Sequence, residues 1–526
     1  MPAYSIDIPK FFNTAGPCDE RWHYMLPPLP RLPDAPKLVD RGQYFVVHAP
    51  RQSGKTTALR ALARKLQAEG RYAAVLFSCE TGQRQRDDIG EVESVLIGAI
   101  RSAAQDQLPP AWHPPDPVPS VPVGLQFNEY LRGWAKACPR PVVLLADEID
   151  ALQGEALNSV LRQLRAGFAN RPEGFPWSVV LCGLRDVRDY KAAAGGDPSG
   201  LGTASPFNIK VHSFTLEGFT ASDVRALLEQ HTTATGQRFT DEAVARIHAL
   251  AQGQPWLTNA LAAEVVDRLG VTGDVTTNDI DAAKERLILA RATHLDSLLA
   301  RLHEPRVRRV VDPIVAGGHV EPGDAYDDDL AYARDLGLVR LKPLEIANPI
   351  YREIIIRVLS APAEERVQTD LHGRFVHPDG RLDFDGLLAA FVPFWLQHGA
   401  LLQTKLGYRE AAAQLVLMAF LQRIVNGSGF LEREVGVGRG RVDLLIRWPL
   451  GDARWQNEAL EVKVRTEHTG DPTEEGLAQL DAYLDRLGLD HGALVIFDRR
   501  TPPSAGKVEH LSMHTPQGRA ARVLRV

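Results

Sequence analysis

The chain has 526 residues, more than one hydrophobic core usually supports, so we expect three or four domains. Its composition is 44% hydrophobic and 24% charged, as in an ordinary soluble protein, and its net charge of −6 excludes a general electrostatic attraction for nucleic acid. The sequence shows no signal peptide and no apolar run of membrane-spanning length. We therefore expect a cytoplasmic protein with no membrane partner and with reduced cysteines.

The first 215 residues combine a proline-rich start with an α/β pattern. Residues 1–40 contain the stretch PPLPRLPDAP and predict an irregular, extended lead-in. Residues 41–215 contain continuous apolar runs, which are typical of parallel strands covered by helices on both faces. The predicted strands are 44–49, 72–80, 141–150 and 177–186, and a helix is predicted at 56–70.

The pattern becomes helical after residue 215. Residues 216–290 predict a helical module, with amphipathic segments at 221–234, 240–252 and 255–269. Residues 291–360 end in the order helix, short hairpin, helix, which is typical of a winged-helix module. A last domain, 383–526, begins with helices and ends rich in strands, so the fold class is α/β with several domains.

A phosphate-binding motif follows the first predicted strand. Residues 49–56 read Ala-Pro-Arg-Gln-Ser-Gly-Lys-Thr, which is the P-loop pattern with Ala49 in place of its first glycine. The backbone N–H groups of such a loop surround the phosphates of ATP, while Lys55 reaches the β- and γ-oxygens and Thr56 binds Mg²⁺. The predicted nucleotide-contacting residues are Pro50, Arg51, Gln52, Ser53, Gly54, Lys55, Thr56 and Thr57.

An acidic pair completes the predicted ATPase site. Asp147 and Glu148 come directly after the buried residues Val142–Ala146, at the carboxyl end of this predicted strand, and the carboxyl ends of parallel strands face the ligand crevice. We expect Asp147 to hold Mg²⁺ and Glu148 to polarise the attacking water. Taken without the P-loop, the same pair would indicate the capped start of a helix.

Four segments together resemble a known family. HAPRQSGKTT, LLADEID, VVLCGLRDVRDY and GQPWLTN are similar to the AAA-like ATPases of bacteria and archaea that are related to the STAND group. The resemblance covers about residues 15–360, and it implies that 216–290 is a lid with the turn Gly253–Pro255 near the nucleotide. It places Arg185 where relatives have a γ-phosphate sensor or a trans-acting arginine. A surface ion pair with Asp186 or Asp189 is the alternative for Arg185.

A second candidate site lies in the last domain. Asp443 lies on one predicted strand, and Glu461 and Lys463 are two apart on the next one, so their side chains point to the same face. Two carboxylates at one place are unfavourable unless they bind a metal ion. Asp443 and Glu461 are hard oxygen ligands suited to Mg²⁺ or Mn²⁺, and Lys463 would stabilise a phosphate transition state. A solvated, charged sheet is the alternative.

The order of elements around these residues resembles the PD-(D/E)XK, or restriction-endonuclease-like, nuclease fold. The core predicted at 408–497 is αβββαβ, and Gln479 and Tyr483 match the QxxxY motif of the RecB-like branch. The resemblance also implies an acidic metal ligand on the first core helix. Glu410 matches best, and Glu432 and Glu434 compete with it.

The sequence as a whole predicts an ATPase joined to a metal-dependent nuclease that cleaves DNA. The tail after residue 498 is locally basic, which suits either a phosphate track or a solvated terminus. Two alternatives stay open: a STAND-like switch, or a motor acting as a homo-oligomer, whose C-terminal domain binds nucleic acid without cleaving it. A role in defence against mobile DNA would rest on analogy alone.

Overall fold

The computed structural model divides the chain into two compact units. Unit 1 comprises Met1–His294 with Arg334–Gly337, and unit 2 comprises Leu295–Ala333 with Leu338–Val526. The residues that the structure describes are 8–80, 88–118, 120–185, 210–290, 300–302, 304–315, 328–355, 375–406, 416–418, 420–421, 425, 429–434, 443–451, 454–465, 470–498 and 508–526.

Unit 1 is built on a five-stranded sheet in the order β2-β3-β4-β1-β5, in which every neighbouring pair is parallel. This confirms the predicted parallel sheet. Its strands are β1 (Tyr44–His48), β2 (Ala73–Ser78), β3 (Val142–Asp147), β4 (Ser178–Gly183) and β5 (Lys210–Thr215). The first four match the predicted apolar runs, whereas β5 was not predicted.

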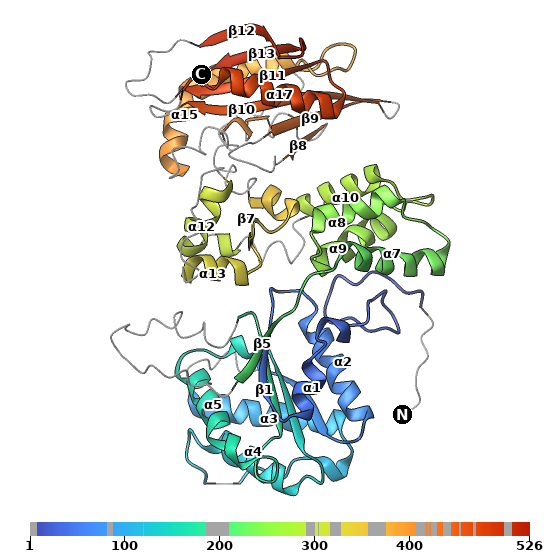
Figure 1. Ribbon diagram of the computed structural model, residues 1–526, viewed down its shortest axis with the longest axis vertical. Helices are drawn as coiled ribbons and strands as arrows, with labels where there is room; N and C mark the ends of the chain where they lie inside the picture. The colour runs from blue at the N-terminus through green and yellow to red at the C-terminus, as the bar shows by residue number, and fades with distance from the viewer. Residues whose placement is uncertain are drawn as a thin grey trace. The chain divides into compact units, whose positions relative to one another are not determined.

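Helices cover both faces of this sheet (Figure 1). Alternate residues of β1 enter two separate cores: Phe45 and Val47 pack with one set of helices, and Tyr44 and Val46 with the other. Burial on both faces explains why the strands read as continuous apolar runs. One face carries α1 (Ala35–Asp40) and α2 (Lys55–Ala68), and the other α3 (Ile89–Gln107), α4 (Gln126–Ala137) and α5 (Gly154–Gly167).

The prediction of an extended lead-in is wrong near residue 40. A short 3-10 helix spans Leu29–Arg31, and α1 follows it. Leu32 and Val39 are fully buried against the sheet. Proline is compatible with the first turn of a helix, where its missing N–H would have no intrahelical partner, and Pro36 takes that position in α1.

The helical part of unit 1 follows the sheet. It contains α7 (Ala221–Thr235), α8 (Asp241–Ala251), α9 (Pro255–Ala263) and α10 (Thr277–Leu289), and the five residues Glu264–Arg268 after α9 are π-helical. The threonines that precede α7, α8 and α10 act as N-caps, which stabilise the start of each helix. Three of these helices match the predicted amphipathic segments.

In the described residues at the start of unit 2, the named elements are helices and a small hairpin. They are α12 (Pro305–Val315), α13 (Asp328–Asp335, which ends within unit 1), β6 (Val339–Leu341) and β7 (Leu344–Ile346), and residues 349–355 are helical. The predicted order of helix, hairpin and helix is therefore present. A winged-helix identity stays a prediction.

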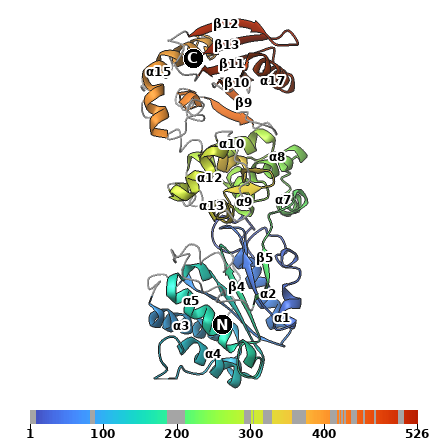
Figure 2. The ribbon, with the colours of Figure 1, turned by 60° about the vertical axis from the view of Figure 1, so that its left-hand side comes forward.

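The C-terminal part of unit 2 is a mixed six-stranded sheet in the order β12-β13-β11-β10-β9-β8. Its strands are β8 (Phe430–Glu434), β9 (Asp443–Gly451), β10 (Arg454–Arg465), β11 (His491–Asp498), β12 (Glu509–His514) and β13 (Ala520–Arg525). The long helix α15 (Phe384–Leu406) and α17 (Thr473–Leu487) lie on opposite faces (Figure 2). Among the described helices, none combines the length and apolarity needed to cross a membrane.

The tail is not a solvated terminus, because β12 and β13 pair with each other and β13 also pairs with β11. Its arginines within the described residues form ion pairs with aspartates of the same unit. The pairs are Arg519 with Asp481, Arg522 with Asp385 and Arg525 with Asp471. These contacts weaken the interpretation of the tail as a phosphate track.

Candidate functional site

The P-loop connects β1 to α2, at the carboxyl edge of the parallel sheet. Gly54 has φ +89°, and a Cβ there would lie 3.1 Å from Nη1 of Arg31, so the position requires glycine. Lys55 begins α2, and its Nζ donates to the carbonyl oxygens of Ala49 at 2.7 Å and Pro50 at 2.9 Å. Burial lowers the pKa of Lys55. The loop therefore holds the ammonium group beside its own backbone.

The remaining predicted P-loop residues differ in exposure. Arg51 and Gln52 are exposed, whereas Ser53 is buried and its hydroxyl donates to the carbonyl of Pro50 at 2.8 Å. The hydroxyl of Thr57 accepts the backbone N–H of Cys18 at 3.1 Å, which ties the N-terminal segment to α2. These residues are contiguous, so the structure necessarily brings them together.

The two predicted ATPase motifs meet at one point. The hydroxyl of Thr56 lies 2.6 Å from Oδ2 of Asp147, although the residues are 91 apart in sequence. Asp147 ends β3 and is 4% exposed. A hydroxyl and a buried carboxylate both offer hard oxygen ligands, so these two residues suit the binding of Mg²⁺.

Glu148 adopts a left-handed conformation, with φ 56° and ψ 42°. Its Oε2 accepts a hydrogen bond from the hydroxyl of Ser78 at 2.9 Å, and Ser78 ends the neighbouring strand β2. Burial raises the pKa of Glu148, the hydrogen bond from Ser78 opposes this shift, and the charges of Glu80 and Asp147 add to it. Ser78 was not predicted, although its place at the carboxyl end of a predicted strand was a usable signal.

The structure corrects one alternative for Arg185. The side chain is 6% exposed, and its Nε lies 3.8 Å from Oδ2 of Asp335, which belongs to the same unit. Arg185 is therefore not in a surface ion pair, and Asp186 and Asp189 lie outside the described residues. Gly253 has φ +76°, and its carbonyl accepts the N–H of Phe219 at 2.7 Å, so the turn at Gly253 contacts the segment before α7.

The second predicted site centres on the ammonium group of Lys463. Its Nζ donates a hydrogen bond to Oε1 of Gln479 on α17, and lies 3.3 Å from Oε1 of Glu461. Lys463 is 10% exposed at its side chain and Glu461 is fully buried. Tyr483 is fully buried in the core between α17 and the sheet. The structure therefore brings Glu461, Lys463 and Gln479 together, whereas Tyr483 belongs to the core beneath α17.

The predicted acidic ligands have different outcomes. Asp443 is the register partner of Glu461 on β10 and of Glu434 on β8. Three acidic residues are therefore paired side by side across three neighbouring strands. Glu410 lies outside the described residues. Within the described part of the chain, no three His, Cys, Asp or Glu side chains are grouped as a metal site.

Sequence reasoning missed Glu475 on α17. Its Oε1 lies 3.5 Å from Nζ of Lys463 and accepts a hydrogen bond from Nε2 of Gln479 at 2.6 Å. A carboxylate can only accept and an ammonium can only donate, so these two neighbours fix the orientation of the Gln479 amide. The i, i+4 spacing of Glu475 and Gln479 on a predicted helix was a usable signal.

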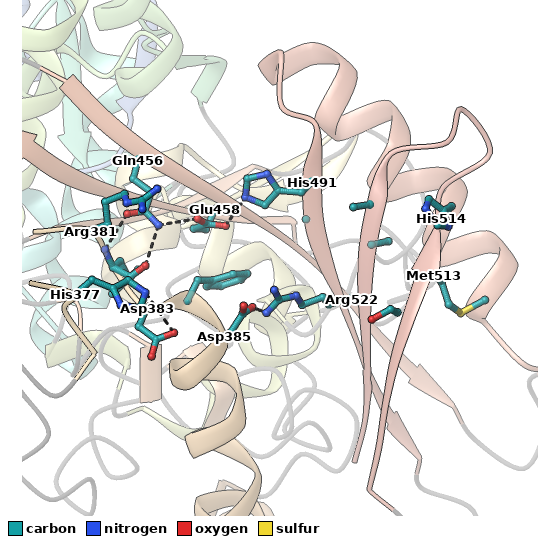
Figure 3. A pocket seen from close by; sticks show the side chains of 16 residues that line it. His377, Arg381, Asp383, Asp385, Gln456, Glu458, His491, Met513, His514 and Arg522 are labelled. Atoms are coloured by element: carbon teal, nitrogen blue, oxygen red, sulfur yellow. Dashed lines mark hydrogen bonds and ion pairs between the residues drawn. The ribbon is translucent and has the colours of Figure 1, made fainter. Parts of the chain in front are cut away.

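A cavity of about 500 Å³ lies elsewhere in the same domain (Figure 3). Glu458, 4% exposed, lines it and lies 3.2 Å from Nε2 of His491. Nε2 of Gln456 donates to Glu458 at 2.8 Å, and the same side chain exchanges hydrogen bonds with the backbone of Leu382. Glu458 and Glu461 are an odd number of residues apart on β10, so this cavity and Lys463 lie on opposite faces of the sheet.

Comparisons with known proteins agree with the first site. A family model described as "AAA domain" matches residues 39–190. This part of the chain is therefore a P-loop ATPase domain that binds ATP. A search of curated proteins found no significant match.

A search of solved structures finds matches of low sequence identity, among them the following three. The Walker-type ATPase PABY2304 of Pyrococcus abyssi is 13% identical, with TM-score 0.46, and the match covers 65% of this chain and 99% of that one. The Holliday junction branch migration motor RuvB of Thermotoga maritima is 16% identical, with TM-score 0.33, covering 62% and 92%. Domain III of the T. maritima replication initiation protein DnaA is 13% identical, with TM-score 0.33, covering 52% and 98%.

Proposed function

We propose that this chain couples ATP hydrolysis in unit 1 to metal-dependent cleavage of DNA by the C-terminal domain of unit 2. The proposal of nuclease activity is supported by the contact of Lys463 with both Glu461 and Gln479. Asp443 lies opposite Glu461 in the register of β9 and β10. A solvated, charged sheet would leave these groups exposed, but Glu461 is 0% exposed.

In the ATPase site, Lys55 and the loop amides bind the phosphates, and Thr56 and Asp147 would hold Mg²⁺. The half-buried Glu148 orients and polarises the attacking water. The lid role of 216–290, with its turn at Gly253, and the sensor role of Arg185 belong to this proposal as well.

In the nuclease site, Asp443 and Glu461 would hold Mg²⁺ or Mn²⁺, with Glu410, Glu432 or Glu434 as a further ligand. Such an ion activates water and neutralises charge on the phosphate. Lys463 stabilises the negative charge that develops on the scissile phosphate, and Gln479 holds the lysine in place. Tyr483 anchors α17 through the core.

The proposal is tested by incubating the purified full chain with linear and circular DNA in Mg²⁺, Mn²⁺ or EDTA, with and without ATP. Lys463→Ala removes the proposed catalytic group, and Arg454→Ala, at the exposed start of the same strand, is the matched control. We expect metal-dependent cleavage by the native chain and by Arg454→Ala, and none by Lys463→Ala.

Two other results would point away from a nuclease. DNA binding without cleavage under every metal condition would favour a switch or an oligomeric motor that only binds nucleic acid. The absence of both binding and cleavage would remove DNA as a partner.

A further inference from the structure

Arg31 lies in the proline-rich segment before the ATPase sheet, and its guanidinium group bridges two backbone carbonyls. Nη1 donates to the carbonyl oxygen of Ser53 at 2.9 Å, and Nη2 donates to that of Glu217. The Cζ atom lies 5.2 Å from the ring centre of Phe219. The first carbonyl belongs to the P-loop and the second precedes α7.

The surroundings of Arg31 are unusual for an arginine. Burial lowers its pKa to about 10, against the opposing charges of Asp223 and Glu217. Its Nε is buried and has no hydrogen-bond partner among the described residues. Removing a guanidinium from water is unfavourable unless it is compensated. Here two main-chain carbonyls and an aromatic ring compensate for the lost water.

The contact with Ser53 bears directly on the phosphate site. Ser53 and Gly54 share a peptide bond, and in a planar trans peptide the N–H points away from the carbonyl. Gly54 has no side chain to restrict this peptide and adopts φ +89°. A donor that holds the Ser53 carbonyl on one side therefore directs the Gly54 N–H to the other side.

We propose that Arg31 is a positioning residue for nucleotide binding. It fixes the Ser53–Gly54 peptide so that the Gly54 N–H faces the β-phosphate of ATP or ADP. Through the carbonyl of Glu217 it also joins the P-loop to the segment that leads to the helical module. Phe219 extends this connection, because its N–H donates to Gly253 at 2.7 Å.

Unit 1 offers a matched control in Arg171. Its guanidinium also donates to main-chain carbonyls, those of Phe168 at 2.6 Å and of Gly42, and it also stacks on aromatic rings. Burial lowers its pKa as well. Gly42 precedes β1, so Arg171 contacts the amino end of this strand, whereas the phosphate site lies at its carboxyl end.

The test compares Arg31→Ala, Arg31→Lys and Arg171→Ala in the full chain. ADP affinity is measured by calorimetry, and kcat and KM for ATP by phosphate release. Losing a charged hydrogen bond to the loop should weaken ADP binding and raise KM by roughly tenfold while kcat is retained, since the loss is one of binding. Arg31→Lys should show a smaller rise.

Arg171→Ala should lower the thermal unfolding midpoint but leave ADP affinity and KM within about twofold of the native chain, because it acts on stability alone. If Arg31→Ala behaves in the same way, with unchanged affinity, the proposal is wrong. If Arg31→Ala does not fold, Arg31→Lys decides: an unchanged KM in that variant also overturns the proposal. The result is independent of the nuclease, because no readout involves DNA.

Discussion

Thr56 donates a hydrogen bond to Asp147 at 2.6 Å, and this contact joins the P-loop to the acidic end of β3. The strand order places β4 between β1 and β3, so the two motifs converge across the carboxyl edge of the sheet rather than along adjacent strands. Two oxygen ligands for Mg²⁺ therefore come from different parts of the sequence.

Replacing Lys55 should remove the main positive charge that faces the phosphates. We expect Lys55→Ala to abolish ATPase activity and to weaken nucleotide binding at least about tenfold, because a charged hydrogen-bond donor is lost. Phosphate release and a fluorescent-nucleotide titration measure the two effects. Lys65→Ala, at a partly exposed position of the same helix, is the control and should retain both functions. Hydrolysis by Lys55→Ala at the native rate would contradict the assignment.

Glu148→Gln should separate binding from turnover. The amide retains the size of the side chain but cannot polarise water, so we expect near-native ATP affinity with turnover reduced about a hundredfold or more. Glu155→Gln, an exposed position on α5, should leave both unchanged. A native rate of hydrolysis in Glu148→Gln would show that another group is the base.

Substitutions in the proposed nuclease site should abolish DNA cleavage without affecting ATP hydrolysis. We expect Asp443→Ala and Lys463→Ala each to abolish DNA cleavage, because each removes a group from the reacting centre, while ATP hydrolysis persists. A gel assay of cleavage and a phosphate-release assay on the same preparations test this separation. Cleavage that survives in both variants would place the nuclease elsewhere.

Nucleotide state should control cleavage. A bound γ-phosphate orders the parts of a P-loop protein that relax after hydrolysis, and useful control requires about a tenfold difference in rate between states. The rate of cleavage at saturating DNA should therefore differ between ATP, ADP and no nucleotide. In Glu148→Gln, which does not hydrolyse ATP, the cleavage rate should stay fixed at one of these values. Rates that agree within about twofold would leave two independent enzymes on one chain.

The start of α17 should show pH-dependent stability. The hydrogen bond from Thr473, followed by the charges of Arg525 and Arg465, holds the pKa of Asp471 below its ordinary value. A lowered folded-state pKa stabilises the protein above the unfolded-state pKa of about 3.9, and this contribution is lost as the pH falls through the folded-state value. Asp471→Asn should therefore unfold at a lower temperature than the native chain at pH 7.

The difference in unfolding temperature should close as the pH falls below about 4. Thermal scans of the full chain at several pH values measure it. Glu474→Gln removes a charge from the same helix end without these hydrogen bonds and should lack this pH dependence. If the difference in unfolding temperature between Asp471→Asn and the native chain were the same at every pH, the titration of Asp471 would not be its source.

Local patterns allowed much of the ATPase to be predicted. The P-loop residues are contiguous, and strands buried on both faces read as apolar runs such as Val142–Asp147. The tail strands were missed because an edge strand such as β12 is exposed at most of its positions and gives no such run. Arg31 was missed because its contact with Ser53 depends on how the chain folds back between them.

The backbone at Glu148 makes catalysis and stability compete for one position. A non-glycine residue in the left-handed region is strained by about 1 kcal/mol or more, and glycine would relieve this. A laboratory selection that rewards only resistance to heat would therefore enrich glycine at position 148. The survivors would still bind ATP but would no longer hydrolyse it.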